Sequence, residues 1–109
     1  MKELSADLLD EITGRVARSL NPVMIYLFGS HAYGVADKDS DVDLLVVVRD
    51  TGIPPRQLAR RGRQSLWGMR VPVDLIVCTE SEFGKWGKVR CNPIHTAIEK
   101  GKLIYESGN

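Results

Sequence analysis

Apolar positions recur along the chain with two different periods. Near the start they follow one face of a helix that begins at a Ser5 cap and stops at Asn21-Pro22; these positions are Leu8, Leu9, Ile12, Val16 and Leu20. Residues 23–28 form an unbroken apolar run, and residues 42–48 and 71–77 are mainly apolar; all three segments are too short for helices. The pattern therefore predicts one amphipathic helix and three strands: a buried strand at 23–28, a second at 42–48, and a third at 71–77 that Pro72 places near a sheet edge or a strand start.

Proline and glycine mark the remaining boundaries. Pro54 and Pro55 open a basic helix that extends to about residue 67, and Asn92 caps a last helix that Gly101 ends. Residues 103–105 form a short additional strand, residues 29–40 a loop or a brief helical turn, and residues 81–89 fit either helix or loop. The order of elements predicts an α/β (α+β) fold, a small mixed sheet flanked by helices, as one domain over residues 1–109.

The connection between the second and third strands bears on their pairing. Roughly twenty residues with a helical pattern separate them, which is enough for a crossover and so for a parallel pair. Sequence leaves the order of strands within the sheet open.

Composition narrows the class of protein. The 109 residues are 43% apolar and 27% charged, with a formal net charge of +1, which fits a folded domain and excludes a polycation that coats nucleic acid. No apolar run reaches the roughly 18–20 residues of a membrane span, and the acidic, amphipathic start is unlike a signal peptide. Two cysteines, Cys78 and Cys91, are too few for a disulfide scaffold, so both are expected to be inert thiols in a reduced, cytoplasmic protein.

Three aspartates occupy positions where carboxylates are costly. Asp41 and Asp43 lie on one face near the start of an apolar strand, and Asp74 interrupts the apolar run 71–77. Carboxylates buried together require a cation, and oxygen-only ligands favour Mg²⁺ or Mn²⁺. These residues predict a site for two metal ions, which clamp a triphosphate and activate an attacking oxygen.

Gly29 and Ser30 supply the second half of this site. They directly follow a buried strand, where backbone N–H groups and the Ser30 hydroxyl can face phosphate, and glycine permits a close approach. A Walker-type loop is absent. Aspartates alternate at positions 37, 39, 41 and 43, as they do in an EF-hand calcium loop. The EF-hand interpretation fails, because Val42 stands where the loop requires glycine and Val48 stands where it requires the closing acid.

The combined motif resembles a known family. Residues 26–30 (Tyr-Leu-Phe-Gly-Ser), ten intervening residues, residues 40–44 (Ser-Asp-Val-Asp-Leu) and residues 73–75 (Val-Asp-Leu) are similar to the minimal nucleotidyltransferases of the DNA polymerase beta superfamily, over nearly the whole chain. The resemblance implies a nucleotidyltransferase fold and Mg²⁺-dependent transfer of AMP from ATP with release of pyrophosphate. It further implies that Asp41 and Asp43 hold the metals, that Asp74 completes the catalytic metal site and assists deprotonation of the acceptor, and that Gly29 and Ser30 bind the triphosphate.

The chain departs from this family at two positions. Arginine is common directly after Gly-Ser and again two residues later, where this chain has His31 and Tyr33. The departure removes two fixed charges near the triphosphate. His31 remains a candidate donor to phosphate, with a packing or surface role as the alternative.

About 30 residues follow the third strand, too few for an acceptor-binding domain. Stand-alone members of the resembled family typically act as antitoxins that transfer AMP to a tyrosine of a HEPN ribonuclease toxin, and the resemblance implies that partner here, with homo- or hetero-oligomers both open. Two alternatives are a non-catalytic module that neutralises its partner by occlusion, and an aminoglycoside-type enzyme that modifies a small molecule.

Other notable side chains have ordinary interpretations. Arg56, Arg60 and Arg63 share one helical stripe, which fits a solvated face or an anion-facing surface. His95 has no partner at ligand spacing and is read as structural. The aromatic residues Trp67, Phe83 and Trp86 are expected to pack in the core or at its edge, with a protein interface as the alternative.

Overall fold

A computed structural model describes residues 5–33, 41–69, 71–89 and 92–107. In chain order the elements are α1 (Ala6–Leu20), β1 (Met24–Phe28), α2 (Ser30–Tyr33), β2 (Val42–Val48), α3 (Pro55–Ser65), β3 (Val73–Thr79), α4 (Glu80–Trp86), α5 (Pro93–Lys100) and β4 (Lys102–Glu106). The strands form one mixed sheet in the order β3-β2-β1-β4. The predicted fold class, a small mixed sheet flanked by helices, is confirmed.

Local sequence accounts for the helix boundaries. The Ser5 side chain accepts a hydrogen bond from the Leu8 N–H, as predicted for the cap of α1, and Asn92 caps α5 in the same way through Ile94. The ambiguous region after β3 is helical, because Thr79 and Glu82 form a reciprocal capping box at the start of α4.

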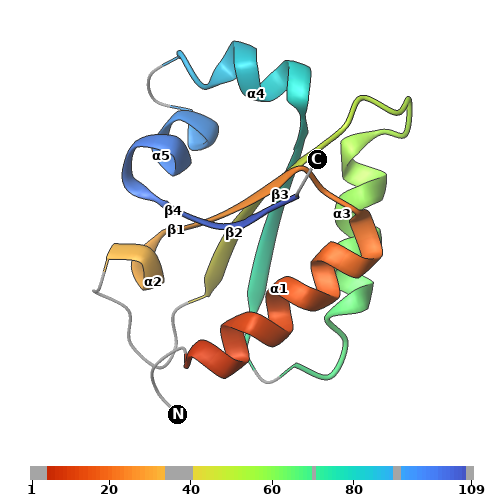
Figure 1. The fold of residues 1–109 in the computed structure, drawn as a ribbon, viewed down its shortest axis with the longest axis vertical. Coiled ribbons are helices and arrows are strands. Elements are labelled where there is room, and N and C mark those ends of the chain that lie inside the picture. Colours follow the sequence, from red (N-terminus) through yellow and green to blue (C-terminus); the bar gives the residue numbers. More distant parts are fainter. Residues whose placement is uncertain (1–4, 34–40, 70, 90–91, 108–109) are drawn as a thin grey trace.

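Helices cover both faces of the sheet (Figure 1). α1 and α3 lie on one face, and α4 and α5 lie on the other. The strand pair β2–β3 is parallel, with α3 as its crossover, whereas β1 pairs antiparallel with both β2 and β4. The crossover that the sequence allowed is thus present, and the strands that it joins are parallel.

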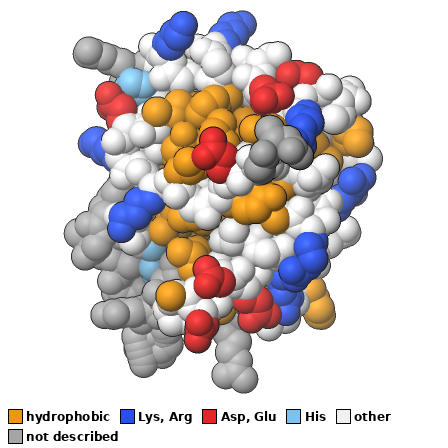
Figure 2. All heavy atoms as spheres, viewed as in Figure 1, with side chains coloured by type: hydrophobic (Ala, Val, Ile, Leu, Met, Phe, Trp, Pro, Cys, Tyr) orange, Lys and Arg blue, Asp and Glu red, His pale blue; other side chains and the backbone are white. Residues whose placement is uncertain are grey.

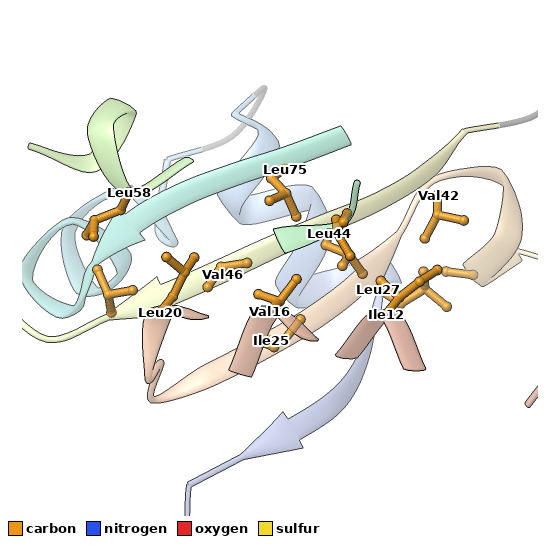
Figure 3. Packing of buried hydrophobic residues seen from close by; sticks show 13 residues of the cluster. Ile12, Val16, Leu20, Ile25, Leu27, Val42, Leu44, Val46, Leu58 and Leu75 are labelled. Atoms are coloured by element: carbon orange, nitrogen blue, oxygen red, sulfur yellow. The ribbon is translucent and has the colours of Figure 1, made fainter. Parts of the chain in front are cut away.

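The main core lies between the sheet and the pair α1 and α3 (Figure 3). Ile12 and Val16 of α1 are fully buried against Leu44 and Val46 of β2. A smaller cluster lies on the opposite face beneath α4 and α5; its members are Leu45, Val47, Cys78, Ile94 and Ala97. Alternate residues of β2 therefore serve two cores, which explains why that strand is a continuous apolar run after Asp43.

Within the residues that the structure describes, no helix is long and apolar enough to cross a membrane.

Candidate functional site

The turn after β1 places backbone against a carboxylate. Gly29 has a φ of 78°, a left-handed conformation that favours glycine, and α2 begins at the next residue. A Cβ atom added to Gly29 would collide with Oδ2 of Asp43. Glycine is needed here both for the backbone conformation and for the space that the Asp43 carboxylate occupies.

Asp43 and Asp74 are direct neighbours across the parallel strands. Asp43 of β2 pairs with Asp74 of β3, and on its other side it pairs with Phe28 of β1. Paired positions on adjacent strands project their side chains from the same face, and the strands lie roughly 5 Å apart. The row Phe28–Asp43–Asp74 thus brings together two of the predicted site residues.

This row lies on the face of the sheet that carries α4 and α5. Leu45 and Val47, which alternate with Asp43 along β2, belong to the cluster beneath these helices. α4 begins after Thr79, at the far end of β3, so the row stands at the other end of the same face. Asp74 is exposed and Asp43 is half-buried, which leaves the carboxylates accessible from solvent.

Asp41 lies directly before β2 and is exposed. It stands two residues from Asp43, and its negative charge acts on the Asp43 carboxyl. A joint role of Asp41 and Asp43 in metal binding stays a prediction.

The electrostatics of Asp43 link these residues. Burial raises the pKa of the Asp43 carboxyl above its ordinary value, and the negative charges of Asp74 and then Asp41 raise it further, while His31 lowers it. The predicted site residues Asp41, Asp74 and His31 therefore each lie close enough to Asp43 to act on its charge.

The donor chemistry of this cluster fits a divalent cation, although its side chains are not arranged as a finished cage. Among the described residues, no three His, Cys, Asp or Glu side chains converge closely enough to hold a metal ion. Asp41, Asp43 and Asp74 nevertheless offer carboxylate oxygens, the ligands that Mg²⁺ prefers, and their mutual repulsion would be relieved by a bound cation. Two metal ions on Asp41, Asp43 and Asp74 remain a prediction.

The remaining predicted nucleotide contacts adjoin the row. His31 is half-buried in α2, and Ser30 is the first residue of that helix. The Ala32 N–H donates to the Gly29 carbonyl at 3.0 Å, which closes the turn. Phosphate binding by Gly29, Ser30 and His31 stays a prediction. The sequence analysis gives no role to Phe28, which is half-buried and pairs with Asp43 across the strands. The position of Phe28 directly before Gly29 is the sequence signal that points to it.

Several ordinary interpretations are confirmed. Cys78 is a buried free thiol, and burial, with a further contribution from Glu82, raises its pKa to about 12. His95 bonds through Nδ1 to the Gly87 carbonyl at 2.8 Å and lies 3.2 Å from Glu99, a structural role. Phe83 stacks on Tyr26 with ring centroids 5.8 Å apart. Cys91 lies outside the described residues.

The expected packing of Trp67 is wrong. Its side chain is 87% exposed, because α3 ends at Ser65 and the following turn carries the indole away from the core. Trp86 is also exposed, at 37%. The predicted arginine stripe on α3 is exposed to solvent; its members are Arg56, Arg60 and Arg63.

Comparison with known proteins assigns the class. The nucleotidyltransferase domain family matches residues 9–104, and the chain belongs to this family. A provisionally assigned nucleotidyltransferase from Sulfolobus solfataricus superposes with a TM-score of 0.62 at 24% identity, over 92% of this chain and 78% of the other. A toxin–antitoxin structure with AMP-PNP superposes with a TM-score of 0.57 at 24% identity, over 91% of this chain and 74% of the other. No curated protein matches the sequence. At these identities the two structures establish the fold.

Proposed function

We propose that this nucleotidyltransferase transfers AMP from ATP to a hydroxyl of a partner protein, a tyrosine of a HEPN-type toxin, and so acts as an antitoxin in the cytoplasm. The observation that carries the proposal is the registered pair Asp43–Asp74, held against the Gly29 turn with Asp41 beside it. The family gives the reaction class, and the similar toxin–antitoxin structure with AMP-PNP supports the nucleotide and the kind of partner.

Each residue has a role in this proposal. Asp41 and Asp43 would hold two Mg²⁺ ions, and Asp74 would complete the site. Bound Mg²⁺ supplies positive charge that neutralises the triphosphate and lowers the pKa of a coordinated hydroxyl. Gly29 brings the backbone of the turn close to the phosphates, where Ser30 and His31 would donate hydrogen bonds.

The transfer step is a displacement at the α-phosphorus of ATP. The acceptor hydroxyl oxygen forms a bond to this phosphorus while the bond to the bridging oxygen of the β-phosphate breaks, and pyrophosphate leaves. Asp74, exposed on the edge strand β3, accepts the hydroxyl proton. Its exposure suits a base that must meet a group presented by another protein.

Co-expression with the product of the neighbouring reading frame tests the proposal. Intact-mass spectrometry of that product is expected to show a gain of one or more AMP units, absent with Asp74→Asn and retained with Asp10→Asn, an exposed aspartate of α1 that serves as a matched control. An unmodified partner with the wild-type chain would contradict it.

Two observations favour a second candidate, neutralisation by occlusion without transfer. The described residues form no ready three-ligand metal group. His31 and Tyr33 also stand at positions where arginine is common in the resembled family. This candidate predicts that Asp43→Asn protects cells from the partner as well as the wild-type chain does. Loss of protection with Asp43→Asn, with an unchanged amount of complex, would exclude it.

A further inference from the structure

The outward face of α3 is strongly basic. Leu58, Ala59 and Gly62 bury the inner side of this helix against α1 and β3, which leaves four arginines exposed on the outside: Arg56, Arg60, Arg61 and Arg63. The sequence contains no acidic residue from position 51 to position 73. Lys and Arg side chains lie along the right-hand side of the molecule in Figure 2, where Figure 1 draws α1 and α3.

Trp67 extends this basic face. Arg56, Arg60 and Arg63 share one stripe of α3, and Trp67 follows in the turn directly after the helix ends at Ser65, where its indole is in solvent. At 87%, Trp67 has the greatest exposure among the large apolar side chains that the structure describes. An indole left in water next to arginines gains free energy when a partner covers it.

The backbone beneath Trp67 is held in place. The Trp67 N–H donates to the Gln64 carbonyl at 3.2 Å, and Arg15 of α1 donates from Nη1 to the Trp67 carbonyl at 3.0 Å. Gly68 follows with a φ of 88°, which sets the direction of the turn. Because these contacts hold the backbone in place, binding at Trp67 requires little further ordering of the main chain.

One acid of the adjoining helix α1 is paired. Glu11 of α1 lies 2.8 Å from Arg15, between Oε2 and Nη2. Together these two side chains add no net charge beside Trp67. The exposed arginines of α3, which itself carries no acidic residue, give the outward face of this helix a positive charge.

We propose that the α3 face, formed by Arg56, Arg60, Arg63 and Trp67, docks an acidic helical segment of a partner protein, which covers the indole with apolar side chains. Tryptophan and arginine are the residue types that carry most binding energy in protein–protein interfaces. A nucleic acid is disfavoured, because the chain has a net charge of only +1 and a single aromatic side chain here cannot stack successive bases.

The docking face is separate from the carboxylate row. α3 covers one face of the sheet, whereas Asp43 and Asp74 project from the other. A partner on α3 therefore leaves the carboxylates open. The proposal goes beyond the function proposed above, and its test requires neither nucleotide nor Mg²⁺.

The test measures binding of defined peptides to the full chain. Trp86→Phe leaves Trp67 as the single tryptophan, since the sequence contains two. The probes are a panel of helical peptides with glutamates around a Leu-Phe pair, and the same peptides with lysine in place of glutamate. We expect the glutamate peptides to shift Trp67 emission to the blue and to bind in the micromolar range, more weakly as salt is added.

Matched variants locate the site. Trp67→Ala and the double change Arg60→Glu with Arg63→Glu should each weaken binding at least about 10-fold, while Lys85→Glu with Lys88→Glu, at exposed positions on and just after α4, should not. Unchanged melting temperatures establish that the variants fold. Absence of binding up to about 1 mM, equal binding of lysine peptides, or insensitivity to Trp67→Ala would overturn the proposal. Tighter binding of an oligonucleotide, or self-association through Trp67, would also overturn it by assigning another occupant.

Discussion

Asp43 and Asp74 face each other across the parallel strands β2 and β3, so two carboxylates stand side by side at the open end of one sheet face. Burial and the neighbouring acids raise the pKa of Asp43, which means that its charged form destabilises the fold. A site selected for stability alone would avoid this arrangement. The destabilisation by the charged Asp43 is explained if this carboxylate serves to hold cations.

The first prediction concerns the stability of an uncharged variant. Asp43→Asn should raise the melting temperature in metal-free buffer at pH 7, by about 3 °C, because it removes the repulsion from Asp74 and Asp41. Calorimetry or circular dichroism measures the change. Asp10→Asn on α1 is the control and should have no effect; a lower melting temperature for Asp43→Asn would contradict the prediction.

The second prediction follows from the sign of the same pKa shift. The folded-state pKa of Asp43 lies above the unfolded value, so the folded chain binds more protons between the two values and stability falls as pH rises through this window. Above the raised pKa of Asp43, the stability that its protonated form contributes is lost completely. Subtracting the urea-unfolding free energies of Asp43→Asn from those of the wild type, from pH 3 upward, isolates this contribution; a difference independent of pH would count against it.

The third prediction separates backbone strain from the Asp43 contact. Gly29→Ala should cost about 1–2 kcal/mol for the left-handed backbone and should also displace the Asp43 carboxylate, which removes transferase activity. Gly52→Ala is the matched control, because Gly52 has a similar φ of 84° and open space where the Cβ would be. Gly52→Ala should lose stability and keep activity. Equal activity of the two variants would refute the role given to the Gly29 turn.

The fourth prediction concerns Cys78. With a pKa of about 12, only about one thiol in ten thousand is ionised at pH 8, and the side chain is buried. In a Cys91→Ser background, Cys78 should not react with a disulfide reagent at pH 8 until the chain is unfolded in urea. Reaction of the native chain at the rate of a free thiol would show that the β3 core opens readily.

Sequence was sufficient for the elements whose signals are local. The apolar run 42–48 coincides with β2, and the caps at Ser5 and Asn92 start α1 and α5 as predicted. The capping box at Thr79 and Glu82 is also a local signal, and it determines the start of α4 where the apolar pattern of residues 81–89 fits either helix or loop.

The register of β2 with β3 and the exposure of Trp67 could not be predicted from the sequence, because both depend on distant parts of the chain. The match of Asp43 with Asp74 requires α3 to cross over with a definite length, and a slip of one residue would place the two carboxylates on opposite faces. Trp67 was expected to pack because large apolar side chains usually do; the early end of α3 at Ser65 reverses this.

The most direct test of the central claim is transfer of label from ATP labelled at the α-phosphate. The purified chain, its partner protein and Mg²⁺ are incubated together, and label on the partner is measured for the wild type, Asp41→Asn, Asp74→Asn and the control Asp10→Asn. The account predicts Mg²⁺-dependent labelling that falls at least about 100-fold in the Asp41 and Asp74 variants and persists in the control. Absence of label with the wild type, or equal labelling by the wild type and Asp41→Asn, would contradict it.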